Sequence, residues 1–188
     1  MHIFPEKGPK NTEETLRIAL KAAAKQELPM LVSSNTGETV EKLLAIMEET
    51  GLSVPVVMGG QVDGFANPGT NALTAEKRAA LESKGVKIVT AAHALSGAER
   101  ALSRKFSGVY PVEIVAHTLR MLSQGTKVCV EIGMMAMDCG AVEYGKPVVA
   151  VAGTGRGADT AVILTPAYTA DFLSTKIHEL LCKPGLYD

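Results

Sequence analysis

The chain has 188 residues, a length that predicts a single domain over residues 1–188. Hydrophobic residues make up 46% of the chain and charged residues 21%, which excludes a disordered linker protein. The formal net charge is −1, so no general positive field is available to hold nucleic acid or an anionic membrane. Any ligand must therefore be bound by a local site.

Helical and strand-like patterns alternate along the first half of the chain, which is typical of a sheet covered by helices on both faces. Asn11 and Glu14 have the spacing of a capping box, and Thr74 is typical of a helix N-cap. In chain order we expect a helix over 11–25, a strand over 28–34, a helix over 40–49, a strand over 53–58, a long loop over 59–73, a helix over 74–84 and a strand over 86–90.

The second half of the chain contains one segment whose period is ambiguous. Residues 127–142 first alternate like a strand, yet their apolar residues also fit one face of a helix. Ser96 and Glu99 form a second capping-box pair, and Gly125 is typical of a residue that ends a helix. The other elements expected here are a short helix from 96, a helix over 111–123, strands over 146–153 and 160–166, and a closing helix over 171–182.

The segment SSNTGET leaves the first predicted strand and enters a helix. Unpaired backbone N–H groups at a helix start favour an anion, and neighbouring hydroxyl and amide groups add hydrogen-bonding atoms. A plain helix cap is the alternative, and Glu38 counts against a bare phosphate unless it only complements the helix dipole. The predicted phosphate-binding residues are Ser33, Ser34, Asn35, Thr36, Gly37 and Thr39.

A second segment, GTGRGAD, joins the two strands predicted over 146–153 and 160–166. Its glycines allow close approach of the main chain to a ligand, and an arginine fork suits phosphate oxygens. A plain turn is the alternative, and Asp159 would repel phosphate if it faced the ligand. Because ligands gather at strand ends in open α/β sheets, the predicted contacts are Gly153, Thr154, Gly155, Arg156 and Gly157.

Other chemical signals in the sequence are weaker. Neither loop matches the common nucleotide-binding patterns, and no histidine or cysteine has metal-ligand spacing, so no metal site is expected. His93, close in sequence to Ser96 and Arg104, is the candidate catalytic acid or base, with a buried structural histidine as the alternative. The odd cysteine count and the absence of a signal-peptide pattern or long apolar run predict a cytoplasmic protein without membrane partners.

Several segments together resemble a known family. PMLVSSNTGETVEKLL, VPVVM, VCVEIGMMAMDCG and VVAVAGTGRGADTAVIL resemble the C-terminal α/β domain of pyruvate kinase. Over nearly its whole length the chain is similar to the free-standing pyruvate kinase α/β domain-like proteins of prokaryotes, which share HALSGAER and GTGRGADTA. The resemblance implies a three-layer α/β/α sandwich with a mixed five-stranded sheet of order 3-2-1-4-5, whose last strand is antiparallel. It also implies a helix over 126–140.

The resemblance also carries implications for function. In regulated pyruvate kinases this domain binds a sugar bisphosphate through loops that match the two segments, although Asn35 and Glu38 depart from the family pattern. The free-standing relatives imply flavin mononucleotide (FMN) in the corresponding cleft, with an unestablished physiological role. We therefore expect this chain to bind FMN, and weak oxidoreductase activity is the reaction that such a cofactor suggests. A non-enzymatic sensor of a sugar phosphate is the alternative. Pyruvate kinase catalysis belongs to a barrel domain that this chain lacks, so that activity is not expected.

For an FMN site, the sequence offers few partners. Arg104 or Arg156 would supply the counter-charge to the phosphate, and Ser96 lies close to Arg104. Because tryptophan is absent, the ring must pack on His93, on methionines, or on Phe65, Phe106 and Tyr110. In pyruvate kinase this domain takes part in a subunit contact, so the resemblance allows a homo-oligomer.

Overall fold

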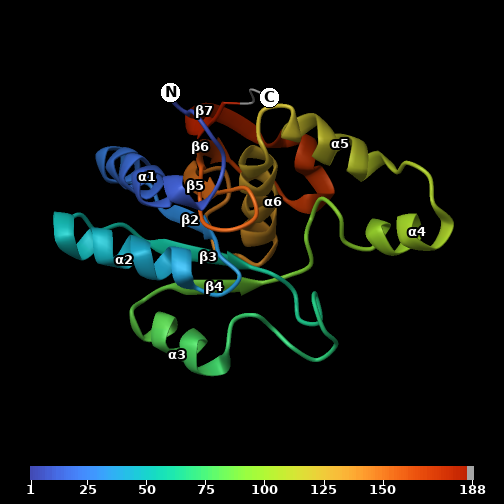
Figure 1. The fold of residues 1–188 in the computed structure, drawn as a ribbon, viewed down its shortest axis with the longest axis horizontal. Coiled ribbons are helices and arrows are strands. Elements are labelled where there is room, and N and C mark those ends of the chain that lie inside the picture. Colours follow the sequence, from blue (N-terminus) through green and yellow to red (C-terminus); the bar gives the residue numbers. More distant parts are fainter. Residues whose placement is uncertain (186–188) are drawn as a thin grey trace.

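The computed structural model in Figure 1 describes residues 1–185, and residues 186–188 of the domain expected over 1–188 lie outside the described residues. The elements in chain order are β1 (His2–Phe4), the 3-10 helix η1 (Pro9–Asn11), α1 (Thr12–Gln26), β2 (Met30–Ser33), α2 (Glu38–Thr50), β3 (Val56–Gly60), α3 (Ala75–Ser83), β4 (Lys87–Thr90), α4 (Glu99–Phe106), α5 (Pro111–Arg120), α6 (Gln124–Asp138), β5 (Val148–Ala152), β6 (Thr160–Thr165), the 3-10 helix η2 (Thr169–Ser174) and β7 (Lys176–Pro184).

Within residues 1–185 these strands form a seven-stranded mixed sheet of order β1-β7-β6-β5-β2-β3-β4. The five strands expected from the sequence lie next to one another in the expected order, and β6 runs antiparallel to β5. The expected count of five is wrong, because β7 pairs antiparallel with β6 and β1 pairs parallel with β7. The strands β5, β2, β3 and β4 are parallel, so their carboxyl ends meet at one edge.

The closing helix expected over 171–182 is wrong, because η2 and β7 occupy that segment. Leu180 packs in the apolar cluster on one face of the sheet and Leu181 in the cluster on the other, as alternate residues of a strand do. Pairing with β6, for example Leu164 opposite Ile177, satisfies backbone N–H and C=O groups on one edge of β6, which a helix could not do. Tertiary pairing therefore decides between two local patterns.

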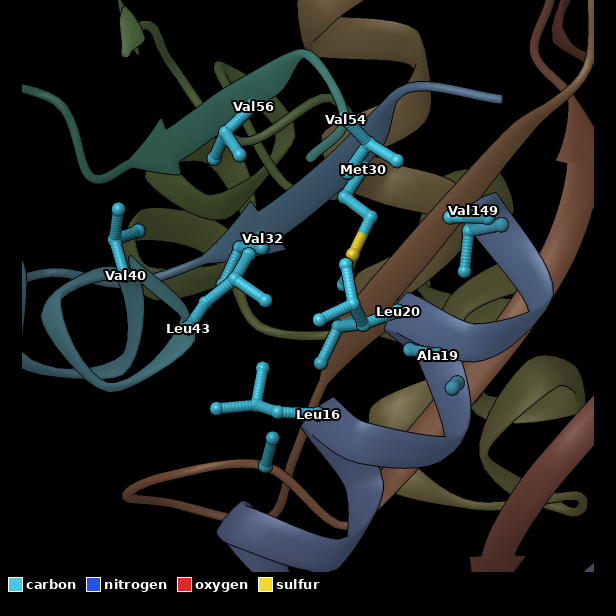
Figure 2. Packing of buried hydrophobic residues seen from close by; sticks show 14 of the residues in the cluster. Leu16, Ala19, Leu20, Met30, Val32, Val40, Leu43, Val54, Val56 and Val149 are labelled. Carbon is cyan, nitrogen blue, oxygen red and sulfur yellow. The ribbon is translucent and has the colours of Figure 1, made fainter. Parts of the chain in front are cut away.

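Two apolar cores lie on opposite faces of the sheet. Met30 and Val32 of β2 point to the first core, where Figure 2 shows them packed with Leu16 of α1 and Leu43 of α2. Leu31, between them in sequence, belongs to the second core, under α5 and α6. The helices α1, α2 and α3 therefore cover one face and α5 and α6 the other, which makes three layers (Figure 1).

Of the helix N-caps predicted from the sequence, the structure confirms one and contradicts two. Thr74 caps α3 as expected and accepts a backbone N–H of the first turn at 3.2 Å. The capping box at Asn11 does not form, because this side chain donates to the Glu6 carbonyl at 2.7 Å. The box at Ser96 does not form either: α4 begins at Glu99, whose carboxylate accepts two N–H groups at the start of α5, at 3.1 and 3.3 Å.

Gly125 does not end a helix, as the sequence suggested, but lies in the first turn of α6. The preceding helix already ends at Arg120. A Cβ at Gly125 would lie 2.2 Å from the hydroxyl oxygen of Thr160, so glycine lets α6 approach β6 closely. The segment 126–140, ambiguous in period, is confirmed as helical, since α6 spans Gln124–Asp138.

We expect Gly125→Ala to lower the free energy of unfolding by about 3 kcal/mol, because overpacking typically costs 1–3 kcal/mol or more. In a helix with free space at this position the same change would be stabilising, because alanine has a higher helix propensity than glycine. Urea unfolding measures the effect. Gly60→Ala is the control, because the nearest atom to a Cβ there is at an ordinary 3.5 Å. Equal effects of the two changes would contradict the close approach of α6 to β6.

Candidate functional site

A pocket of about 550 Å³ opens at the edge of the sheet where the four parallel strands end. Its walls come from the loop after β2, the end of β3, the loop before α3, the turn after β4, the helices α4, α5 and α6, and the β5–β6 loop. Small-molecule sites in proteins have volumes of about 300–1,000 Å³, and open α/β sheets bind ligands at this edge. The pocket is therefore the candidate functional site.

Most residues that the sequence analysis selected come together in this pocket. Those lining it are Ser33, Ser34, Asn35, Thr36, Thr39, His93, Gly153, Gly155, Arg156 and Gly157. Gly37 and Thr154 are in the same loops but do not line the pocket, and their backbone N–H groups donate within the loops. Ser96 donates its N–H to the His93 carbonyl in a turn, and Arg104 is exposed on α4, so neither reaches the pocket.

The loop after β2 presents the start of α2 to the pocket. Gly37 occupies the N-cap position with a φ of 87°, a conformation that favours glycine, and its N–H donates to the Ser34 hydroxyl at 3.1 Å. No side chain within residues 1–185 caps the first turn of α2. The helix start therefore offers backbone N–H groups, with the hydroxyls of Thr36 and Thr39, to an anion in the pocket.

The β5–β6 loop is held in shape from within. The buried Asp159 carboxylate accepts N–H groups from Gly8 at 3.0 Å and Thr154 at 3.2 Å, and the Thr160 hydroxyl at 2.9 Å. The sequence left open whether this carboxylate faces the ligand and repels a phosphate. Asp159 does not line the pocket, so it does not face an anion bound there. A Cβ at Gly153 would lie 2.7 Å from a carbonyl oxygen of the same loop, so this glycine serves the loop's own packing.

One face of α6 forms a wall of the pocket, and its charged pair was not assigned to the site by sequence reasoning. Lys127 and Glu131, each 3% exposed, form an ion pair at 2.5 Å, and the second carboxylate oxygen accepts the Leu95 N–H at 3.0 Å. Burial lowers the pKa of Lys127, and the Glu131 carboxylate opposes that shift. The signal in the sequence was a Lys–Glu pair four residues apart in an apolar helix. The other pocket residues on this face are Gln124, Val128, Ile132 and Met135.

The pocket is locally positive although the chain is nearly neutral. Four cationic side chains line it, against two carboxylates, those of Glu38 and Glu131. The cations are Arg100 of α4, Arg120 of α5, Lys127 of α6 and Arg156 of the β5–β6 loop. An anionic ligand is therefore the kind that this lining attracts.

His93 lies at the pocket beside an aromatic ring and a guanidinium. Its ring centroid is 5.0 Å from that of Phe65, and the Arg100 guanidinium lies 5.6 Å from the Phe65 centroid. Burial lowers the pKa of His93, and the charges of Lys127 and Arg100 add to the effect while Glu131 opposes it. The imidazole is therefore neutral at pH 7 and can accept a proton.

Of the other residues expected to pack on a ligand ring, some line the pocket and some do not. Phe65 and Met135 line the pocket. Phe106, 69% exposed on α4, and Tyr110 do not line it. The helix α4 has no buried residue and stands out from the sheet (Figure 1), which explains why its far end is remote from the pocket.

The lowered pKa of His93 predicts a pH dependence of stability. Between its folded pKa and the ordinary value of about 6.5 the unfolded chain binds more protons, so stability is lost as the pH falls below about 6.5. We expect His93→Gln to reduce the loss of unfolding free energy between pH 7 and pH 5, measured by urea unfolding. The exposed His117, replaced by glutamine, is the control. The assignment would be contradicted by His93→Gln retaining the full wild-type dependence.

Two further findings concern the described part of the chain. Within residues 1–185 no group of three or more His, Cys, Asp or Glu side chains gathers as metal ligands do. None of the helices described there combines the length and the apolar character needed to cross a membrane.

The sequence was also compared with models of known protein families. The model described as pyruvate kinase, alpha/beta domain, matches residues 13–164. The match covers most of the chain and includes both loops of the pocket and the polar face of α6.

Proposed function

The chain belongs to the pyruvate kinase alpha/beta-domain family, and we propose that its pocket binds a phosphorylated small ligand, with FMN as the expected one. The observation that carries the proposal is an uncapped helix start and an excess of positive charge in one pocket at the carboxyl edge of the sheet. Both features favour phosphate, because backbone N–H groups donate to its oxygens and cations offset its charge.

In this proposal the phosphate lies at the start of α2. The N–H groups of its first turn and the hydroxyls of Ser33, Thr36 and Thr39 hold the oxygens, and Arg156 supplies a counter-charge from the β5–β6 loop. Glu38 is exposed in the first turn, where a carboxylate also complements the helix dipole.

The remaining part of the pocket suits a flat, mostly apolar group. Val128, Ile132 and Met135 form an apolar wall on α6, and Phe65 lines the pocket from the long loop between β3 and α3. A Cβ at Gly59 would lie 3.0 Å from Ile132, so the end of β3 has no room for a side chain there. Apolar and thioether groups of this kind pack favourably against planar rings. These residues fit the ring of FMN.

When bound, FMN would supply electron and hydride transfer at its ring. The chain's own contribution would be to bind and orient the ligand through the α2 start and the apolar wall. The neutral His93 would accept or return a proton at its ring nitrogen. A weak oxidoreductase activity would follow from these roles.

The absorption spectrum of the protein as purified tests this proposal, followed by mass identification of any small molecule released on unfolding. We expect flavin absorbance, or a rise in melting temperature when FMN is added, because a ligand that binds only the folded state stabilises it. A colourless protein that FMN does not stabilise would overturn the FMN assignment. Stabilisation by sugar phosphates alone would favour the alternative, a sensor of a phosphorylated metabolite.

A further inference from the structure

The segment between β3 and α3, residues 61–73, borders the pocket. Most connections in compact domains have about 4–6 residues, so this one is long. Gln61 and Ala72 line the pocket near the two ends of the segment, and Phe65 lines it nearer the tip. Figure 1 shows the segment extending beyond the carboxyl end of β3. Every residue from 62 to 72 is exposed or half-buried, so packing in the core does not fix its shape.

Hydrogen bonds within the segment hold its shape instead. The Asn71 side-chain nitrogen donates to the Gln61 carbonyl at 3.2 Å and to the Asp63 carboxylate at 2.6 Å, which closes the neck of the loop. Nearer the tip, Gly64 donates its N–H to the Thr70 carbonyl at 2.8 Å. In the described chain, the hydrogen bonds of residues 62–72 have both partners inside the segment. A loop whose ends are joined and that bonds to itself is a compact unit.

One aromatic side chain joins this unit to the other side of the pocket. The ring centroid of Phe65 lies 5.0 Å from that of His93, which follows β4, and 5.6 Å from the Arg100 guanidinium of α4. All three residues line the pocket, so this contact closes part of its wall. Phe65 is still 44% exposed, and aromatic and cation–π contacts at partly exposed positions are weak. The contact can therefore break while the loop keeps its internal hydrogen bonds.

We propose that residues 61–73 form a lid that moves as one body about its neck, with Phe65 as the latch against His93 and Arg100. The lid opens to admit the ligand and closes beside its ring, which shields the ring from water. The inference rests on the proposed function, because it assumes that FMN occupies the pocket. It adds that the lid, and not the phosphate cradle, sets how fast the ligand enters and leaves.

The rates of FMN association and dissociation test the lid, measured by stopped-flow flavin fluorescence and by dilution of the complex. If the lid must open for both steps, a change that loosens it raises both rates by the same factor. The ratio of the rates, which is the dissociation constant, then stays nearly unchanged. A side chain that only touches the bound ligand changes chiefly the dissociation rate. The two rates therefore distinguish a latch from a simple ligand contact.

Asn71→Ala is the main variant, because Asn71 holds the neck of the lid and does not line the pocket. Without these hydrogen bonds the loop presents Phe65 to the latch less often. We expect both rates to rise about fivefold, with the dissociation constant within about threefold of wild type. Asn67→Ala is the matched control, because Asn67 is exposed in the same loop and contributes its backbone carbonyl to the hydrogen bonds there. It should leave both rates unchanged.

Phe65→Ala removes the latch itself. The association rate should rise by a similar factor of about five, and the dissociation rate should rise further because the contact with the ligand ring is also lost. Melting temperatures of the variants close to that of the wild type show that they fold.

The outcomes separate the lid from the proposed function. Unchanged rates in Asn71→Ala, or a rise in the dissociation rate alone in Phe65→Ala, would overturn the lid and leave FMN binding at the phosphate cradle standing. Equal effects of Asn71→Ala and Asn67→Ala would also overturn it. Failure of FMN to bind the wild-type protein would reject FMN as the ligand, and the lid as its gate.

Discussion

Replacing Thr36 with aspartate is expected to abolish the binding of FMN and of other phosphorylated ligands. Thr36 is exposed and lines the pocket next to the start of α2, so the change places a carboxylate beside the proposed phosphate. Two unit charges 4 Å apart near a protein surface repel by about 4 kcal/mol. Allowing for screening, we expect affinity to fall by about 100-fold or more, as measured by isothermal titration calorimetry with FMN.

The neutral variant Thr36→Asn is the matched control, because asparagine has the size of aspartate without its charge. It should bind FMN at least about tenfold tighter than the aspartate variant does, because its amide group can still donate a hydrogen bond and carries no charge. The aspartate variant should still fold, since an acidic residue near a helix start interacts favourably with the helix dipole. Equal affinities of the two variants would show that no phosphate lies at this loop.

The second large effect concerns stability. We expect Glu131→Gln to lower the free energy of unfolding by about 3 kcal/mol, because Lys127 is only 3% exposed and the change leaves its ammonium without a carboxylate partner. The value is at the lower end of the range for broken buried pairs, since Lys127 borders a pocket that admits water. Urea unfolding at pH 7 measures the change.

The double variant Lys127→Met with Glu131→Gln separates charge from shape. Removing both charges should restore most of the lost stability, because a buried ion pair contributes little more than a neutral pair of similar volume. If the double variant is as unstable as Glu131→Gln alone, the unpaired charge is not the cause of the loss.

The two loops of the pocket were predictable because each carries its signal locally. Serine, threonine and glycine between a strand and a helix indicate a helix start with free donors, and three glycines between strands indicate a tight turn. Since β2 and β5 are parallel neighbours, the sheet brings both loops to one edge. The order of the five expected strands followed from the family resemblance, not from composition or periodicity.

The wall formed by α6 could not be predicted in the same way. Lys127 and Glu131 read as one polar pair in an apolar segment, and only the packing of α6 on β5 and β6 turns them toward the pocket. The role of Gly125 likewise depends on Thr160, which lies 35 positions further along the chain. Contacts of this kind are set by tertiary structure, which periodicity does not encode.

The strand β7 was missed for a related reason. Residues 171–182 have apolar side chains at spacings that suit a helix as well as a strand. Their pairing with β6 is decided by the free edge of a strand that lies elsewhere in the sequence. A local pattern therefore predicts an element at this position but not which type.

A titration of the protein with FMN and with riboflavin tests the central claim most directly, because the two ligands share the ring and differ in the phosphate. Anchoring of the phosphate at the start of α2 predicts that FMN binds about 100-fold tighter than riboflavin or more, as measured by calorimetry. Equal affinities for the two ligands would contradict a phosphate site in this pocket, and the absence of FMN binding would contradict FMN as the ligand.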